Sequence, residues 1–288
     1  MDQGKNILPG GSIIGKVLFV IVALVLLYYL YQFLFGATGL EGMVVINGIK
    51  DGNPDKAYIT TSDKLPAIYE GGEVSVSGWV YINDYSVNRG LNKHVFSLGG
   101  TSFSTLAIFL GPYKNSLAVR VHTKATTAGA AVPAGNTPSP ENLATEDLST
   151  LVVQNLFRNP QTESSLISAS RPCDISSIDL QKWVLVTVTL NNKTCDVYLD
   201  GKLARSCILP SFYKVDKSNF TLNVSDFKGF GGFVSNVSAY NYALNPEQVW
   251  RLYMAGPGPQ YGIFDYIKSL FDPKSLGGFD FPKKNIVA

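Results

Sequence analysis

Two carboxylates with strand spacing are the first residues in this chain whose types could do chemistry. Asp196 and Asp200 are four positions apart, so on one strand they would share a face. Retaining glycosidases use two such carboxylates about 5 to 5.5 Å apart, one as nucleophile and one as acid. Asp200 precedes Gly201, however, and Asp-Gly between apolar runs predicts a hairpin turn. The turn therefore explains Asp200, and an exposed strand position explains Asp196.

Other catalytic patterns are missing from the sequence. His94 and His122 are its two histidines, and without an HExxH motif we expect strand histidines rather than metal ligands. Gly229–Phe233 is rich in glycine but lacks the lysine of a phosphate loop, so it predicts a bend or bulge. No GxSxG elbow is present. We therefore predict that the protein is not an enzyme and has no catalytic, metal-binding or cofactor-binding residues.

The three cysteines predict one disulfide and one remaining thiol. Cys173, Cys195 and Cys207 form no CxxC motif. A three-residue hairpin loop, Asp200–Lys202, would place Cys195 directly opposite Cys207, and a two-residue loop would shift that pairing by one. The spacing alone leaves the pairing open.

Sugar recognition would draw on aromatic rings or on attached glycans. Trp79 and Trp183 are the candidates for stacking on a sugar, although both lie in apolar strands, which favours core packing. Four asparagines begin Asn-x-Ser/Thr sequons. Several of them fall on predicted strands, so we interpret the sequons as chance matches: Asn192, Asn219, Asn223 and Asn236.

The elements that position these residues are mostly short strands. Apolar and polar residues alternate in Glu73–Ile82 and in Leu117–Val121, as in strands with one face in a core. Further candidate strands follow at close spacing and predict a mainly β, antiparallel jelly-roll sandwich: residues 94–98, 106–110, 183–190, 195–199, 203–209, 220–224 and 233–242. Asn245 and Pro246 predict the start of a helix that ends before Gly256.

The run Val17–Phe35 has no charged residue and predicts a transmembrane helix before the sandwich. A cleaved signal peptide is the alternative, but its apolar region is usually about 7 to 15 residues. Lys5 and Lys16 precede the run, while the next basic residue is Lys50, which predicts an N-terminus on the inside and a C-terminal domain on the opposite face.

Length and composition predict one sizeable domain beside this helix. The formal net charge of +2, without a basic block, argues against nucleic-acid binding. The expected layout is an N-terminal tail (1–12), the transmembrane helix (13–36), a linker with an entry strand (37–64), the sandwich (65–257) with a surface insertion (123–165), and a C-terminal helix and tail (258–288).

Several motifs in this order resemble a known family. They are Leu180–Trp183, Asp196–Gly201, the strand Glu73–Ile82, Ala239–Gln248 and Tyr253–Pro257. Over residues 65–257 the chain resembles the laminin-G-like branch of the concanavalin A-like lectin/glucanase superfamily. The resemblance implies glycan or protein ligands, sometimes held through calcium, although no Asp/Asn-dense loop identifies a calcium site. The Glu-x-Asp-x-x-Glu segment of the family's glucanases is missing from the sequence.

Two cysteine segments resemble a narrower group. Cys173-Asp-Ile and Arg205–Pro210 are similar to membrane-anchored laminin-G-like proteins of large double-stranded DNA viruses. That resemblance implies a disulfide between Cys173 and Cys207, with Cys195–Cys207 as the alternative. It also implies a minor capsid protein that tethers the internal membrane of a virion to capsid subunits. The alternative function is a surface adhesin that binds carbohydrate.

Overall fold

The computed structural model describes residues 13–35, 42–124, 148–161 and 173–258. The chain forms two compact units, Met1–Glu41 and Gly42–Ala288. The first contains helix α1 (Ile13–Phe35), in which the large apolar side chains between Val17 and Leu30 are 42 to 74% exposed. Within the described ranges, no helix is long and apolar enough to cross a membrane, so the predicted transmembrane segment is not supported there.

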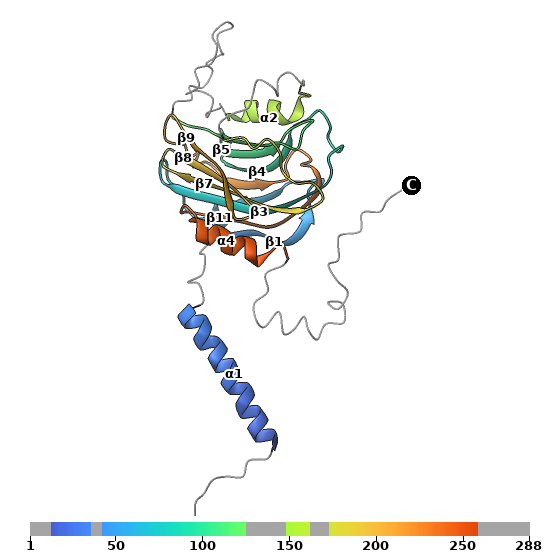
Figure 1. Cartoon of the computed structure of the whole chain (residues 1–288). Coiled ribbons are helices and arrows are strands. Elements are labelled where there is room, and N and C mark those ends of the chain that lie inside the picture. Colours follow the sequence, from blue (N-terminus) through green and yellow to red (C-terminus); the bar gives the residue numbers. More distant parts are fainter. Residues whose placement is uncertain (1–12, 36–41, 125–147, 162–172, 259–288) are drawn as a thin grey trace, which may run out of the picture. The chain divides into compact units, whose positions relative to one another are not determined.

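The second unit is a sandwich of two antiparallel sheets, as predicted (Figure 1). The six-stranded sheet runs in the order β1 (Met43–Asp51), β11 (Gly231–Tyr240), β3 (Glu73–Asp84), β7 (Trp183–Asn191), β8 (Thr194–Leu199) and β9 (Lys202–Ile208). The five-stranded sheet runs in the order β2 (Tyr58–Thr61), β10 (Thr221–Val224), β4 (Lys93–Gly99), β5 (Ser104–Leu110) and β6 (Leu117–Val121). A short 3-10 helix, Ser62–Lys64, follows β2.

Alternation along the strands sends one set of side chains into a common core. Val76 of β3 and its cross-strand partner Val188 of β7 are both at most 1% exposed. Gly78 lies in β3 where an added Cβ would approach the ring of Phe96 in the other sheet to 2.6 Å. Glycine therefore lets this aromatic side chain fill the space between the sheets.

The β8–β9 hairpin resolves the question of the cysteine register. Its loop has two residues, Asp200 and Gly201, both with positive φ as a type I′ turn requires. A bulge follows, because Val197 pairs with Arg205 while Tyr198 pairs with Leu203. The extra residue of the bulge shifts the pairing by one position, which compensates for the loop being one residue shorter than three. Cys195 and Cys207 are therefore directly opposite each other.

A helix covers part of each outer sheet face (Figure 1). Helix α4 (Pro246–Ala255) has the predicted cap, since Asn245 and Gln248 exchange side-chain and backbone hydrogen bonds. Helix α2 (Thr150–Arg158) lies within the insertion and was not assigned from the sequence. Its Val153 and Phe157 pack on alanines and Phe109 of the five-stranded sheet. The other expected elements of the insertion and tail, including a helix at 263–271, lie outside the described residues.

Candidate functional site

A polar groove of about 330 Å³ lies between α2 and the outer face of the five-stranded sheet. Strands β4, β5 and β10, the helix and the turn after β10 all contribute to it. The residues that line it are Ser97, Gly100, Thr101, Ser104, Thr150, Val153, Gln154, Arg158, Asn223, Asp226 and Phe227.

The sheet contributes an amide whose oxygen lacks a partner. Leu222 and Val224 of β10 point into the core, so Asn223 between them projects from the outer face into the groove. Its Oδ1 is buried and accepts no hydrogen bond from the described residues. A buried acceptor left unsatisfied costs about 1 to 3 kcal/mol. A ligand that donates to this oxygen would recover that free energy.

The helix contributes two long polar side chains to the opposite wall. Gln154 and Arg158 are four positions apart on α2 and both line the groove, as side chains on one helical face do. The Arg158 guanidinium lies 5.8 Å from the centroid of the Phe227 ring. Phe227 in turn stacks on Phe157 at 5.0 Å, which connects this wall to the apolar contact beneath α2.

Two buried histidines accept hydrogen bonds from the segments that border the groove, the turn after β10 and the residue before Ser149 and α2. His94 Nδ1 accepts a hydrogen bond of 3.1 Å from the backbone N–H of Asp226, next to the groove. His122 Nδ1 accepts the N–H of Leu148, just before α2, also at 3.1 Å. Burial lowers the pKa of His94 to about 3, so its ring stays neutral and keeps the acceptor that this contact needs. His94 in β4 and His122, directly after β6, therefore both make structural contacts.

The polar side chains suit recognition of a polyhydroxylated ligand. Amide, guanidinium and carboxylate groups present donors or acceptors in pairs, which match adjacent hydroxyl groups. Among the described residues that line the groove, Asp226 provides one carboxylate, whereas glycoside hydrolysis uses a pair. This arrangement can bind a sugar through hydrogen bonds.

The two predicted stacking tryptophans are on the other sheet. Trp79 is 5% exposed and stacks on Tyr253 of α4, with 5.7 Å between the ring centroids. Trp183 is half-buried and contacts Tyr81, its cross-strand neighbour, at 5.4 Å. Neither lines the groove.

The four sequon asparagines differ in exposure. Asn192 and Asn219 are exposed and have positive φ, whereas Asn223 lies in the groove. Asn236 is 9% exposed, donates to the carbonyl oxygens of Gly256 and Gly258, and accepts the N–H of Gly48. A glycan on Asn236 replaces one Nδ2 hydrogen, so at least one of the two hydrogen bonds that Nδ2 donates would be lost.

The carboxylates of Asp196 and Asp200 both accept hydrogen bonds from nearby residues of the six-stranded sheet. Asp200 Oδ1 accepts the N–H of Leu185 at 2.9 Å, and its Oδ2 pairs with Lys182 at 3.1 Å. Asp196 accepts a hydrogen bond from Ser206 on the neighbouring strand. Asp200 and Gly201 form the two-residue loop between β8 and β9.

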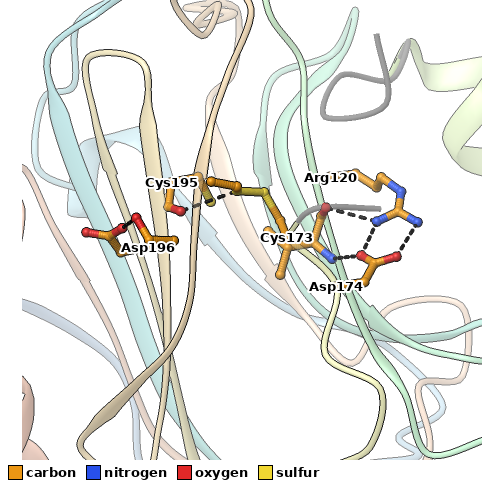
Figure 2. The surroundings of a disulfide bond; sticks show 8 residues. Arg120, Cys173, Asp174, Cys195 and Asp196 are labelled. Carbon is orange, nitrogen blue, oxygen red and sulfur yellow. Dashed lines mark hydrogen bonds and ion pairs between the residues drawn. A yellow bond between two sulfur atoms is a disulfide. The ribbon is translucent and has the colours of Figure 1, made fainter. Parts of the chain in front are cut away.

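The disulfide joins Cys173 and Cys207, as the resemblance implied. Figure 2 shows Cys173 beside the buried ion pair of Arg120 and Asp174. Cys195 is free and fully buried, and burial raises the pKa of its thiol to about 12.

Comparisons with known proteins give a family model and solved structures to which this chain is similar. A family model described as the concanavalin A-like lectin/glucanases superfamily matches residues 161–250. The ligand binding domain of botulinum neurotoxin serotype D, solved with N-acetylneuraminic acid, is 13% identical with a TM-score of 0.44 over 76% of this chain and 47% of that chain. The binding domain of serotype G is 12% identical with a TM-score of 0.39 over 82% and 49%, respectively.

The chain therefore spans about half the length of these toxin domains. A search of curated protein sequences finds no significant match. The family model supports a concanavalin A-like fold for the sandwich.

Sequence reasoning missed the groove because its residues come from three separate stretches of the chain, 97–104, 150–158 and 223–227. One signal was available: Val153 and Phe157 have the spacing of one helical face and predict a small amphipathic helix. The unsatisfied amide of Asn223 has no signature in the sequence, since it depends on the sheet partners and on α2.

Proposed function

We propose that this protein is a non-enzymatic carbohydrate-binding protein that holds a glycan in the groove between α2 and the five-stranded sheet. The observation that carries this proposal is Asn223, which lines the groove and whose buried Oδ1 accepts no hydrogen bond from the described residues. Gln154, Arg158 and Asp226 surround it with further hydrogen-bonding groups. The match to a lectin superfamily model agrees with a binding role.

Binding of the full chain to an oligosaccharide array tests this proposal, followed by calorimetry with the best oligosaccharide. We expect Asn223→Ala to weaken binding about tenfold or more, because it removes a buried hydrogen bond. Thr221→Ala is the matched control, since Thr221 is on the same strand but does not line the groove. No binding on the array, or equal losses in both variants, would contradict the proposal.

The predicted tethering function is the second candidate, and the surface of α1 favours it. The large apolar side chains described between Val17 and Leu30 are exposed all around this helix. A helix that is apolar on every side needs a nonpolar environment, such as a bilayer or a protein partner. Under this proposal the whole run Val17–Phe35, which is longer than the part whose side chains are described, anchors the chain in a membrane with its N-terminus inside, and the sandwich contacts capsid subunits.

Three measurements test the tether. Alkaline carbonate should leave the full chain in the membrane pellet, and protease should spare an N-terminal tag in intact membranes. Cross-linking in purified particles should then join the sandwich to coat subunits. Release of the chain by carbonate would argue against the anchor, and digestion of the tag would reverse the orientation.

A further inference from the structure

All three cysteines converge at one point of the core. Cys207 of β9 is bonded to Cys173, and Cys195 of β8 is directly opposite Cys207. The three sulfur atoms lie within 4.8 Å of one another, and each residue is at most 4% exposed. A free thiol is therefore next to an existing disulfide, on the strand that neighbours one of its two cysteines.

The observed disulfide and its alternative would join different parts of the fold. Ile175, two residues after Cys173, exchanges two backbone hydrogen bonds of 2.9 Å with Leu117 at the edge of the five-stranded sheet. Cys207 belongs to the edge strand of the other sheet. The observed bond thus connects the two sheets, whereas a bond between Cys195 and Cys207 would connect neighbouring strands of one sheet.

The segment that Cys173 attaches is also in contact with the side of the sandwich that carries α2. Asp174 forms a bidentate ion pair with Arg120 and accepts the N–H of Val119 (Figure 2). The Arg120 guanidinium lies 5.5 Å from the Phe109 ring centroid, and that ring meets Phe157 of α2 at 5.4 Å. Release of Cys173 from the disulfide would loosen the contact between Asp174 and Arg120, from which the contacts with Phe109 and α2 continue.

We propose that Cys195 is a resolving thiol that exchanges the disulfide between the sheets for one within a sheet. The deprotonated Sγ of Cys195 attacks Sγ of Cys207, and the bond between Cys207 and Cys173 breaks. Cys173 leaves as a thiolate and takes up the proton that Cys195 lost. One disulfide and one thiol are present before and after, so the step needs no oxidant or reductant.

Burial sets the rate of this exchange. Because the pKa of Cys195 is raised to about 12, the attacking thiolate is scarce at neutral pH and becomes about tenfold more abundant with each pH unit. The disulfide between the sheets is then the long-lived form. The other form is reached faster when the pH rises or when the sheet edge opens.

Disulfide mapping of the full chain tests the exchange. Samples are held at pH 7 or pH 10, quenched with acid, alkylated and digested. We expect alkylated Cys195 at pH 7, and at pH 10 alkylated Cys173 together with a linked Cys195–Cys207 peptide, formed at a rate independent of protein concentration. Cys195→Ser should show no such change. Persistence of the Cys173–Cys207 bond at pH 10, with Cys195 still alkylated, would overturn the proposal.

A variant gives a second test that does not depend on rate. In Cys173→Ser, air oxidation should produce a Cys195–Cys207 disulfide, and exchange of the Ile175 amide hydrogen should quicken. Near-ultraviolet circular dichroism monitors folding of this variant. A folded variant that keeps both thiols free would overturn the proposal, because the two sulfur atoms would then be unable to reach bonding geometry.

Discussion

Acidification should destabilise this protein through one buried imidazole, that of His94. Its ring is fully buried against Phe157 and Phe227, at centroid distances of 5.1 and 6.0 Å. The pKa is about 3 in the folded protein against 6.5 for a free histidine. The unfolded chain therefore takes up a proton in this interval that the folded chain does not. Stability from this group is complete above pH 6.5 and is lost as the pH falls toward 3.

The size of the effect follows from the two pKa values. One pH unit within the window corresponds to about 1.4 kcal/mol, so the step from pH 7 to pH 4.5 costs about 2.5 kcal/mol. Most carboxylates titrate below this range, which leaves histidine as the main contributor. Urea unfolding at several pH values measures the free energy of unfolding directly.

The substitution His94→Asn isolates the cause. Asparagine retains an acceptor near the position of Nδ1 for the Asp226 N–H, although the smaller side chain lowers stability at every pH. We expect the free energy of unfolding of this variant to fall by about 2.5 kcal/mol less than that of the wild type between pH 7 and pH 4.5, because the contribution of His94 is absent. His122→Asn is the control and should retain the loss due to His94. A variant without His94 that loses as much stability as the wild type would refute this reasoning.

Three further predictions concern buried charges and a helix cap. Burial lowers the pKa of Lys93 to about 8, so the free energy of unfolding should rise by about 1 kcal/mol from pH 8 to pH 9. Urea unfolding measures this rise, which should be absent in Lys93→Met. A rise that persists in the variant would exclude Lys93 as its cause. Asp174→Asn leaves the buried Arg120 without its countercharge and should lower the free energy of unfolding by about 3 to 5 kcal/mol, as measured with denaturant. Adding Arg120→Met to this variant should restore part of that stability. No recovery would indicate that the unpaired charge is not the cause of the loss. Asn245→Ala removes the cap of α4 and should lower the free energy of unfolding by about 1 kcal/mol. Glu247→Ala, on the exposed face of the same helix, is the control and should lower it by less in the same unfolding measurement. Equal losses in the two variants would argue against the cap.

The positions of the strands and the N-terminal cap of α4 follow from the local sequence. Alternation in Glu73–Ile82 and Leu117–Val121 marks the two strand faces, and β3 and β6 lie where the alternation predicts them. Asn245-Pro246 begins α4 because a capping side chain and a fixed φ act within one turn. Asp200-Gly201 determines its turn for a similar reason, since both residues accept positive φ. These features depend on neighbours a few positions away.

The register of the cysteines and the groove depend on contacts between distant segments. The spacing of Cys195 and Cys207 could not reveal the bulge after Val197, which makes them opposite despite a two-residue loop. The Cys173–Cys207 disulfide came from a resemblance and not from spacing.

By itself, the sequence determined which segments become strands, which residues face inward and where α4 begins, because these depend on period, turn chemistry and caps. The tertiary structure alone decided that Asn223, Arg158 and Asp226 share one groove and that three sulfur atoms meet in the core. These groups come from segments up to about 70 residues apart in the chain. Their meeting depends on how the two sheets pair and on where α2 packs, and no local pattern encodes either.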